Sequence, residues 1–328
     1  IQDLEKRNHT YITSDGVYFD TKTFPPYGKL GNIDIENLKE GARVEKNQEK
    51  KNPTDFALWK FSSPEDKRQQ EWESPWGTGF PGWHIECSAM SKKYLGETFD
   101  IHTGGVDHIP VHHNNEIAQS ESANGKTQAN FWLHFKHILI NNEKISKSLG
   151  NDIYIDDLLN KNISPLAYRY WLLTADYKTQ INFTWDAVTA SKTAFEKLLI
   201  QISNFENGGS VNKTYKDRFL KLLADDLNTP QAIALIWELM KNPDVPESDK
   251  KATIIDFDKV LGLNIEAISS LASKIEINIP KHIRDLIDER EIARKNKDFV
   301  KSDALREMIL DEGYDVKDTP EGPKISLV

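Results

Sequence analysis

FDIHTGGVDHIPVHHNNEIAQSESANG, residues 99–125, contains the successive parts of an α/β unit. Residues 99–102 have the composition of a buried strand, and Gly104-Gly105 break it. A helix fits residues 111–123 and stops at Asn124-Gly125. Because a strand, a glycine turn and a helix follow one another, the stretch predicts an α/β fold with a parallel sheet.

The same alternation continues on both sides of this stretch. An irregular segment rich in Gly, Pro and aromatic residues, 74–82, leads into a helix predicted from Trp83 to Tyr94. A further strand is predicted from Phe135 to Ile140, and short strands are predicted at residues 17–20 and 56–59. The first half of the chain is therefore expected to hold the α/β part of the fold.

Beyond about residue 155 the pattern becomes helical. Ser164-Pro165 and Thr184 are good starts for two helices, because their hydroxyls can cap the first turn. Apolar residues then recur at steps of three and four, and a highly charged helix pair is expected between His282 and Leu310. This half of the chain is predicted to be a helical bundle followed by a small C-terminal part.

Composition narrows the class of protein but does not identify it. The chain has 328 residues, of which 38% are hydrophobic and 28% charged, and no apolar run approaches the ~18 residues of a membrane helix, so no membrane partner is expected. A single cysteine excludes an intrachain disulfide and favours the reducing cytoplasm. The net charge of -9 argues weakly against a protein that coats nucleic acid nonspecifically.

Three side chains have the chemistry of a metal site. His112 and Glu116 are four residues apart on a predicted helix, so both project from one face, and Cys87 would approach from the preceding helix. Zinc accepts thiolate, imidazole and carboxylate ligands. The alternative is that Cys87 is a small buried apolar residue and that the other two form a solvated pair.

A second group of residues suits a nucleotide phosphate. Lys144 and Lys147 bracket Ser146, and Ser148 and Gly150-Asn151 follow. A loop of this kind can bring cations and hydroxyls onto a triphosphate, and it would lie at the carboxyl edge of the predicted sheet. As composition alone, a short Lys/Ser loop is also an ordinary surface loop.

Taken together and in this order, the motifs resemble the cysteine-specific class I aminoacyl-tRNA synthetases. The Lys/Ser loop is similar to the second signature of that class, Lys-Met-Ser-Lys-Ser, with Ile145 in place of Met. Four other segments also resemble parts of these enzymes: 81–90, 112–120, 225–230 and 303–306. The resemblance covers nearly the whole chain.

The resemblance implies a fold and a domain order. Residues 1–70 would be a connective or insertion region, and residues 71–155 the second half of a Rossmann-like parallel-sheet catalytic core with the Lys/Ser loop. Residues 156–275 would form a helical linker and an anticodon-binding bundle. Residues 276–328 would be a small C-terminal domain that binds tRNA. Basic side chains between residues 281 and 301 could face phosphates, or could equally belong to a salt-bridged, solvated helix pair.

The resemblance also assigns roles to individual residues. Zinc, one ion per subunit, would be held by Cys87, His112 and Glu116. Trp83, His84 and Asp107 would line the pocket for the substrate's amino group and backbone. ATP would be bound by Gly104, Gly105, Lys144, Ser146, Lys147 and Ser148, with the two lysines as the catalytic groups and with Mg²⁺ present. Packing, turn and cap roles are the alternatives for Trp83, His84, the two glycines and Asp107.

The implied reaction has two steps. ATP and L-cysteine would form a cysteinyl-adenylate, and the cysteine tRNA would then accept the acyl group, in a monomeric enzyme. Zinc would select the substrate thiol over the hydroxyl of serine, because a soft thiolate is its better ligand.

Two alternatives and one departure remain. The chain could be a zinc- and ATP-dependent cysteine ligase that acts on a small amino-sugar acceptor, or a noncatalytic tRNA-binding fragment. The family's first signature, His-Ile-Gly-His, and a further zinc-binding cysteine do not occur in these residues. The N-terminal part is therefore expected to be missing, and the 328 residues alone are expected to be inactive in adenylation.

Overall fold

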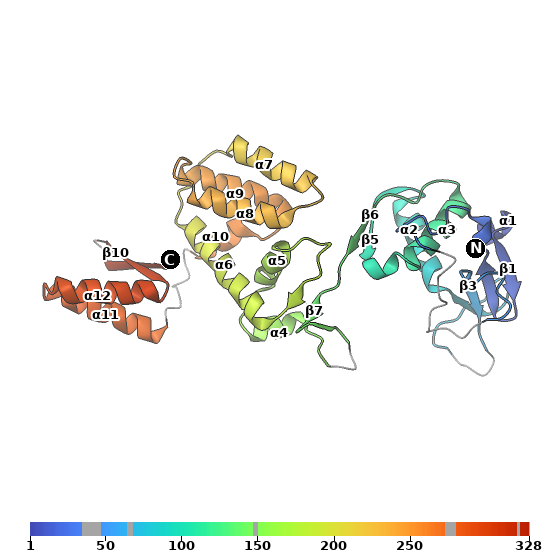
Figure 1. Cartoon of the computed structure of the whole chain (residues 1–328), viewed down its shortest axis with the longest axis horizontal. Coiled ribbons are helices and arrows are strands. Elements are labelled where there is room, and N and C mark those ends of the chain that lie inside the picture. The colour runs from blue at the N-terminus through green and yellow to red at the C-terminus, as the bar shows by residue number, and fades with distance from the viewer. Residues whose placement is uncertain (35–46, 64–67, 147–149, 273–279, 320–321, 328) are drawn as a thin grey trace. The chain divides into compact units, whose positions relative to one another are not determined.

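The fold comes from a computed structural model that describes residues 1–34, 47–63, 68–146, 150–272, 280–319 and 322–327. The chain forms two compact units, residues 1–137 and 138–328 (Figure 1). Both units combine helices and strands, and each contains a pair of parallel strands. The expected α/β class is confirmed; the expected four-part division stays a prediction.

The first unit begins with a four-stranded antiparallel sheet of order β1-β2-β3-β4. Its sheet and flanking elements are α1 Gln2–Lys6, β1 Thr10–Thr13, β2 Gly16–Phe19, η1 Thr21–Thr23, β3 Phe56–Phe61 and β4 Gly79–Pro81. One face packs into an apolar cluster that includes Phe19, Phe56, Leu58 and Ala118. Because Ala118 belongs to a later helix, this cluster joins the sheet to the α/β part of the unit.

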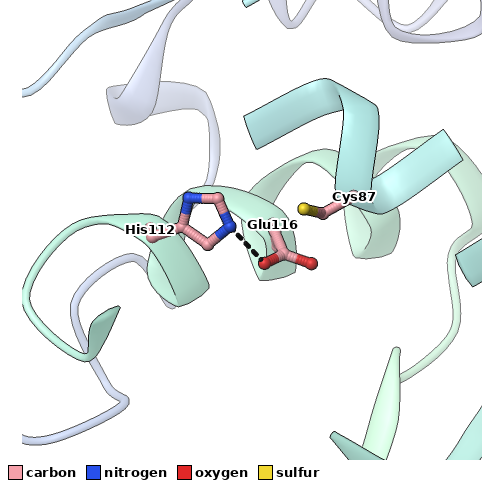
Figure 2. A group of neighbouring side chains, drawn as sticks. All are labelled: Cys87, His112 and Glu116. Atoms are coloured by element: carbon pink, nitrogen blue, oxygen red, sulfur yellow. Dashed lines mark ion pairs between the residues drawn. The ribbon is translucent and has the colours of Figure 1, made fainter. Parts of the chain in front are cut away.

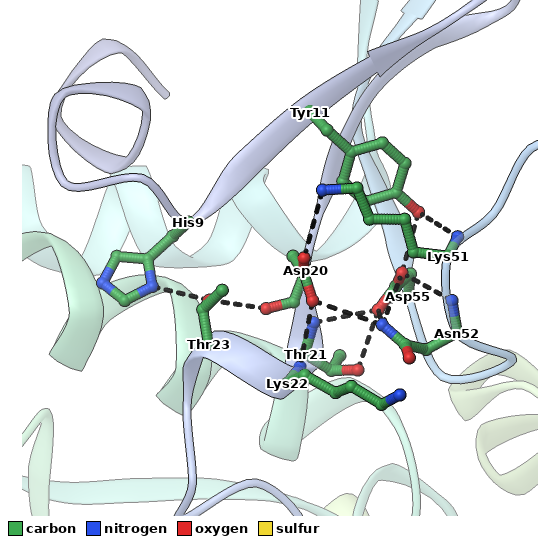
Figure 3. A network of polar contacts seen from close by, with 9 residues as sticks. All are labelled: His9, Tyr11, Asp20, Thr21, Lys22, Thr23, Lys51, Asn52 and Asp55. Carbon is green, nitrogen blue, oxygen red and sulfur yellow. Dashed lines mark hydrogen bonds and ion pairs between the residues drawn. The ribbon is translucent and has the colours of Figure 1, made fainter.

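Asp55 is the centre of a buried polar network beside this sheet (Figure 3). It is 2% exposed, and it accepts hydrogen bonds from Thr21 N at 2.9 Å, Tyr11 Oη at 2.8 Å and Asn52 N at 2.9 Å. The next residue, Phe56, places its ring edge-on against His84, with 5.7 Å between the centroids. The network therefore fixes a residue that packs against His84.

We expect Asp55→Asn to lower the free energy of unfolding of the first unit by about 3 kcal/mol, because several donors aimed at a carboxylate would lose acceptors while buried. Urea denaturation monitored by tryptophan fluorescence measures this. Asp3→Asn is the control, since the Asp3–Lys6 pair is exposed and such pairs contribute less than about 1 kcal/mol. Equal stability of the two variants would contradict the role given to Asp55.

The α/β part of the first unit follows the predicted order closely. Its elements are α2 Trp83–Leu95, β5 Phe99–Gly105, η2 Val106–His108, α3 His112–Asn124 and β6 Ala129–Phe135. β5 and β6 are parallel, in register from Phe99 opposite Ala129 to Gly105 opposite Phe135. The predicted break of the strand at Gly104-Gly105 is therefore wrong, because both glycines pair with β6. The α3 helix ends at Gly125 in the left-handed conformation, as a glycine after a helix favours.

One predicted strand was wrong in its position. Residues 135–140 were expected to be a single strand, but β6 ends at Phe135 and a separate short strand, β7 Leu139–Ile140, follows in the second unit. Residues 129–135 form the ladder with β5 instead. The Lys/Ser loop thus follows a small hairpin, and its place at the carboxyl edge of the β5–β6 sheet stays a prediction.

The second unit contains the predicted helical bundle (Figure 1). β7 pairs antiparallel with β8 Glu143–Lys144 and parallel with β9 Asn182–Phe183. The helices are α4 Ile155–Asn160, α5 Pro165–Leu173, α6 Trp185–Ser203, α7 Lys213–Ala224, α8 Thr229–Lys241, α9 Glu247–Leu261 and α10 Ile265–Ala272. The predicted caps are confirmed: Ser164 Oγ accepts from Ala167 N, and Thr184 Oγ1 from Ala187 N, both at 3.1 Å.

The charged helix pair near the C-terminus is also confirmed. It consists of α11 Lys281–Lys295 and α12 Phe299–Asp311, followed by the hairpin of β10 Tyr314–Thr319 and β11 Gly322–Leu327. Arg290 is only 2% exposed and donates two hydrogen bonds to the Asp318 carboxylate, at 2.9 and 3.1 Å. Arg290 is therefore a structural residue and is not exposed to a phosphate. Within the described chain, no helix is both long enough and apolar enough to cross a bilayer.

Asp318→Asn should destabilise this C-terminal part by about 2 kcal/mol, because the buried Arg290 charge would lose its partner; a fully buried pair would cost more. Hydrogen exchange of the α11 amides measures the loss. Arg290→Met is the matched variant and should cost less, since it removes the buried charge together with the pair. A larger cost for Arg290→Met would contradict this.

The same pair gives a pH dependence with a defined sign. Hydrogen bonding from Arg290 holds the pKa of Asp318 below its ordinary value of 3.8. The stabilisation is therefore complete above about pH 4 and is lost as the pH falls through the lowered pKa.

Candidate functional site

The three residues predicted to hold a metal lie together in the first unit (Figure 2). α2 packs against α3, Cys87 projects from α2, and His112 and Glu116 project from one face of α3. Their ligand atoms all lie within 4.8 Å of one another. Because the side chains already face a common point, a small rotamer change would be enough to bring all three onto one ion.

Burial makes this cluster chemically unusual. Glu116 is 0% exposed, and its Oε1, 2.9 Å from His112 Nε2, accepts no well-aligned hydrogen bond from the described residues. Burial alone would raise the pKa of Glu116, but contacts from His102 and His112 outweigh it and lower the pKa to about 2. A buried carboxylate that stays ionised with an oxygen to spare is a good ligand for a cation.

Cys87 completes the cluster from its more open side. The residue is partly exposed, and burial together with the nearby Glu116 and Glu86 carboxylates raises the pKa of its thiol. Without a cation the thiol therefore stays protonated at neutral pH, whereas a coordinating metal would remove its proton. A hydrogen bond of 2.6 Å between Ser88 Oγ and the side-chain amide of Gln119 holds α2 to α3 next to this residue.

Trp83 and His84 lie beside the metal cluster, against His112. His84 Nδ1 is 2.8 Å from His112 Nδ1, and the Trp83 ring centroid is 4.4 Å from that of His112. Trp83 is 61% exposed, so one of its faces remains open. Burial is the main cause, and the neighbouring His112 the second, that lowers the pKa of His84 to about 4. The His84 side chain is therefore neutral at physiological pH.

A layer of further histidines lies beneath these residues, and the sequence interpretation missed it. His102 and His113 meet edge to face at 4.8 Å, and His113 Nδ1 is 2.8 Å from His134 Nε2. Burial lowers the pKa of His113 to about 3. The signal was present in the sequence, because seven of the nine histidines lie between residues 84 and 137, the others being His9 and His282.

The paired glycines and Asp107 have close neighbours within the first unit. A Cβ at Gly104 would lie 2.5 Å from His113 Cε1, so glycine is required for the histidine layer to pack. A Cβ at Gly105 would lie 2.3 Å from Asp107 Oδ1, and that oxygen is 3.3 Å from His137 Nε2. The contact with His113 gives Gly104 a packing role, whereas the exposed Asp107 side chain beside Gly105 could move aside for a Cβ. The predicted contact of both glycines with adenosine stays a prediction.

The Lys/Ser loop begins in the second unit on β8, which includes Lys144. Asn151 closes the base of this loop: its Oδ1 accepts a hydrogen bond from Ser146 N at 2.9 Å, and its Nδ2 donates to Lys144 O at 3.1 Å. Lys147 and Ser148 lie outside the described residues. The side chain of Lys144 is exposed, as a phosphate-binding group would need to be.

Comparisons with known proteins point to one family. A family profile described as "tRNA synthetases class I (C) catalytic domain" matches residues 1–193. Cysteine–tRNA ligase 1 of Burkholderia lata is 44% identical over 326 residues, which is 99% of this chain and 68% of that protein. Cysteine–tRNA ligase of Treponema denticola is 39% identical, covering 97% of this chain and 70% of its own length. The same enzyme of Borrelia turicatae is 38% identical, covering 99% and 72%.

Proposed function

This chain belongs to the class I tRNA synthetases that attach cysteine to tRNA, and we propose that it does so through a cysteinyl-adenylate made from ATP, with one zinc ion that selects the substrate thiol. The observation that carries the zinc proposal is the convergence of Cys87, His112 and Glu116 within 4.8 Å. Their sulfur, nitrogen and oxygen donors are those that zinc accepts. We expect the protein to be localised in the cytoplasm.

The buried geometry supports a cation at this cluster. Glu116 Oε1 lies against His112 Nε2, with no well-aligned hydrogen bond from the described residues, and the carboxylate is ionised. A cation beside it would replace the hydration that burial removes. When bound, zinc would lower the pKa of a coordinated thiol and bind thiolate sulfur more strongly than a hydroxyl oxygen.

The surrounding residues would orient the ligands and the substrate. With His112 Nε2 facing the metal, its Nδ1 would carry the proton and donate a hydrogen bond to His84 Nδ1, which would fix the ring. The exposed face of Trp83 would cover the substrate, and Asp107 would attract its ammonium group. Direct binding of sulfur would reject serine without a separate editing site.

The ATP half of the reaction would depend on cations and alignment, since the attacking carboxylate comes from the substrate. Lys147 and Lys144 would stabilise charge on the phosphates as pyrophosphate leaves, with Ser146 and Ser148 donating hydrogen bonds and Mg²⁺ bound to the phosphates. The Asn151 contacts at the base of the loop support a defined path for Lys144 and Ser146. Gly104 and Gly105 would lie close to the adenosine.

The tRNA would be recognised by the helical second unit. The names of the curated relatives favour tRNA over an amino-sugar acceptor and over a noncatalytic role. Arg290 and Arg294 are engaged by Asp318, so phosphate contacts would have to come from other basic residues of α11 and α12. A monomer is expected.

The proposal is tested with the protein produced from its native reading frame. Cysteine-dependent exchange of pyrophosphate into ATP reports the adenylate, and charging of purified cysteine tRNA reports the transfer. Both activities should disappear with a zinc chelator and return with added zinc. Full activity in metal-free protein would refute the role of the metal, and exchange without charging would refute the acceptor.

A further inference from the structure

The two oxygens of Glu116 face different partners. Oε1 lies 2.9 Å from His112 Nε2, toward the cluster that contains Cys87. Oε2 has different neighbours: His102 Nε2 and Gln128 Nε2 both lie 3.5 Å from it. The carboxylate is therefore held at Oε2, while Oε1 faces His112 without a well-aligned hydrogen bond from the described residues, as expected of a metal ligand oriented by its neighbours.

Gln128 is placed for this contact by its own backbone. It lies directly before β6, where its N–H donates to Glu121 Oε1 at 3.3 Å and its carbonyl accepts from Phe99 N at 3.0 Å. α3 and β5 thus fix the residue from two sides. The side chain is 1% exposed, and its Oε1 has no hydrogen-bond partner among the described residues. A buried amide oxygen without a hydrogen-bond partner lowers the stability of the fold. A buried glutamine at this position therefore calls for an explanation, and the hydrogen bond from its Nε2 to Glu116 offers one.

We propose that Gln128 is a positioning residue for the zinc ligand Glu116, acting together with His102. Its amide N–H holds Oε2, so that Oε1 is presented to the metal with the carboxylate plane fixed. This inference rests on the proposed zinc site. Gln128 does not touch the metal or the substrate: an amide nitrogen donates a hydrogen bond and does not ligate zinc.

The same geometry argues against a second metal ion at His102, His113 and Glu116, which also lie within 4.8 Å of one another. His113 Nδ1 is already 2.8 Å from His134 Nε2. A cation at Oε2 would also displace the Gln128 amide and leave both of its polar atoms buried without partners. We therefore expect one zinc ion per chain, with the His102 group acting as the support of Glu116.

Two substitutions test the role of Gln128. Gln128→Leu removes the amide and keeps a similar volume, and Gln128→Glu places a carboxylate against Oε2. Zinc affinity is measured by competition with a chromogenic chelator, and the ligand geometry by the visible spectrum of the cobalt-substituted protein. We expect affinity to fall about tenfold for Gln128→Leu and about 100-fold for Gln128→Glu, with a changed cobalt spectrum in both.

Ser122→Ala is the matched control, because Ser122 Oγ on α3 is, like Gln128 Oε1, buried without a hydrogen-bond partner among the described residues. It should leave affinity and spectrum unchanged. Thermal unfolding of each metal-free variant separates a loss of fold from a loss of orientation. Gln128→Leu is expected to unfold at or above the wild-type temperature, since it removes an unpaired buried oxygen.

The outcomes separate this inference from the proposed function. Wild-type protein that binds one zinc, with unchanged affinity in both Gln128 variants, overturns the inference and leaves the proposed function standing. Two zinc ions per chain, one of them lost in His102→Ala, would overturn it in favour of a second metal site. Wild-type protein that binds no zinc would refute the metal in the proposed function, and this inference with it.

Discussion

Cys87→Ser, in the protein produced from its native reading frame, should abolish stoichiometric zinc binding and lower cysteine-dependent pyrophosphate exchange by about 1,000-fold, which corresponds to about 4 kcal/mol of transition-state stabilisation. Cys87 supplies the soft ligand of a cluster whose other two members are imidazole and carboxylate. A serine hydroxyl is isosteric but stays protonated and binds zinc weakly, so the metal would be lost although the fold is kept. Metal analysis of the purified variant and the exchange assay measure the two effects.

Met90→Ala is the control for this substitution, since Met90 lies on the same helix, is 53% exposed and is not one of the three clustered side chains. It should keep both zinc and activity. A Cys87→Ser protein with one zinc ion and wild-type activity would contradict the assignment of Cys87. Loss of activity with full zinc content would move the role of Cys87 from the metal to the substrate.

Lys147→Ala should lower the exchange rate about 100- to 1,000-fold while leaving zinc content unchanged, because it removes one charged donor from the phosphates in the transition state. The expectation comes from the order Lys144-Ile145-Ser146-Lys147-Ser148 and from the resemblance of that motif to the class I signature. Lys144→Ala should have a smaller effect of the same kind. Exchange kinetics at saturating cysteine and varied ATP measure both.

Lys259→Ala provides the matched loss of a positive charge, since Lys259 is an exposed helical lysine paired with Asp256 in the second unit. It should change neither kcat nor KM for ATP. Equal behaviour of Lys147→Ala and Lys259→Ala would mean that the Lys/Ser loop does not act on ATP. A loss of zinc in Lys147→Ala would mean that the two halves of the site are not independent.

Local signals predicted most of the fold. Gly125 marked the end of α3, and Ser164 and Thr184 marked the starts of α5 and α6, because glycine turns and hydroxyl caps act within a few residues. The strand expected at residues 135–140 was misplaced, since pairing with a distant partner decides where a strand ends. The spacing of apolar residues around Phe135 did not contain that information.

The residues of the candidate site also differ in whether the sequence could predict them. The i, i+4 spacing of His112 and Glu116 was sufficient to place both on one helix face, and Cys87 was brought to them by the packing of α2 on α3. Gln128 and the histidine layer were not predicted, because their contacts with Glu116 and with one another depend on the register of β5 and β6. The concentration of histidines in this part of the chain could have indicated the histidine layer, but not Gln128.

Zinc K-edge X-ray absorption, recorded with and without L-cysteine, is the most direct measurement of the shared claim that Cys87, His112 and Glu116 hold an ion that takes up the substrate's sulfur. We expect the number of sulfur ligands to rise by one, at about 2.3 Å, when cysteine is added and to stay constant with serine. A zinc spectrum that ignores cysteine, in protein that still forms the adenylate, would contradict the claim.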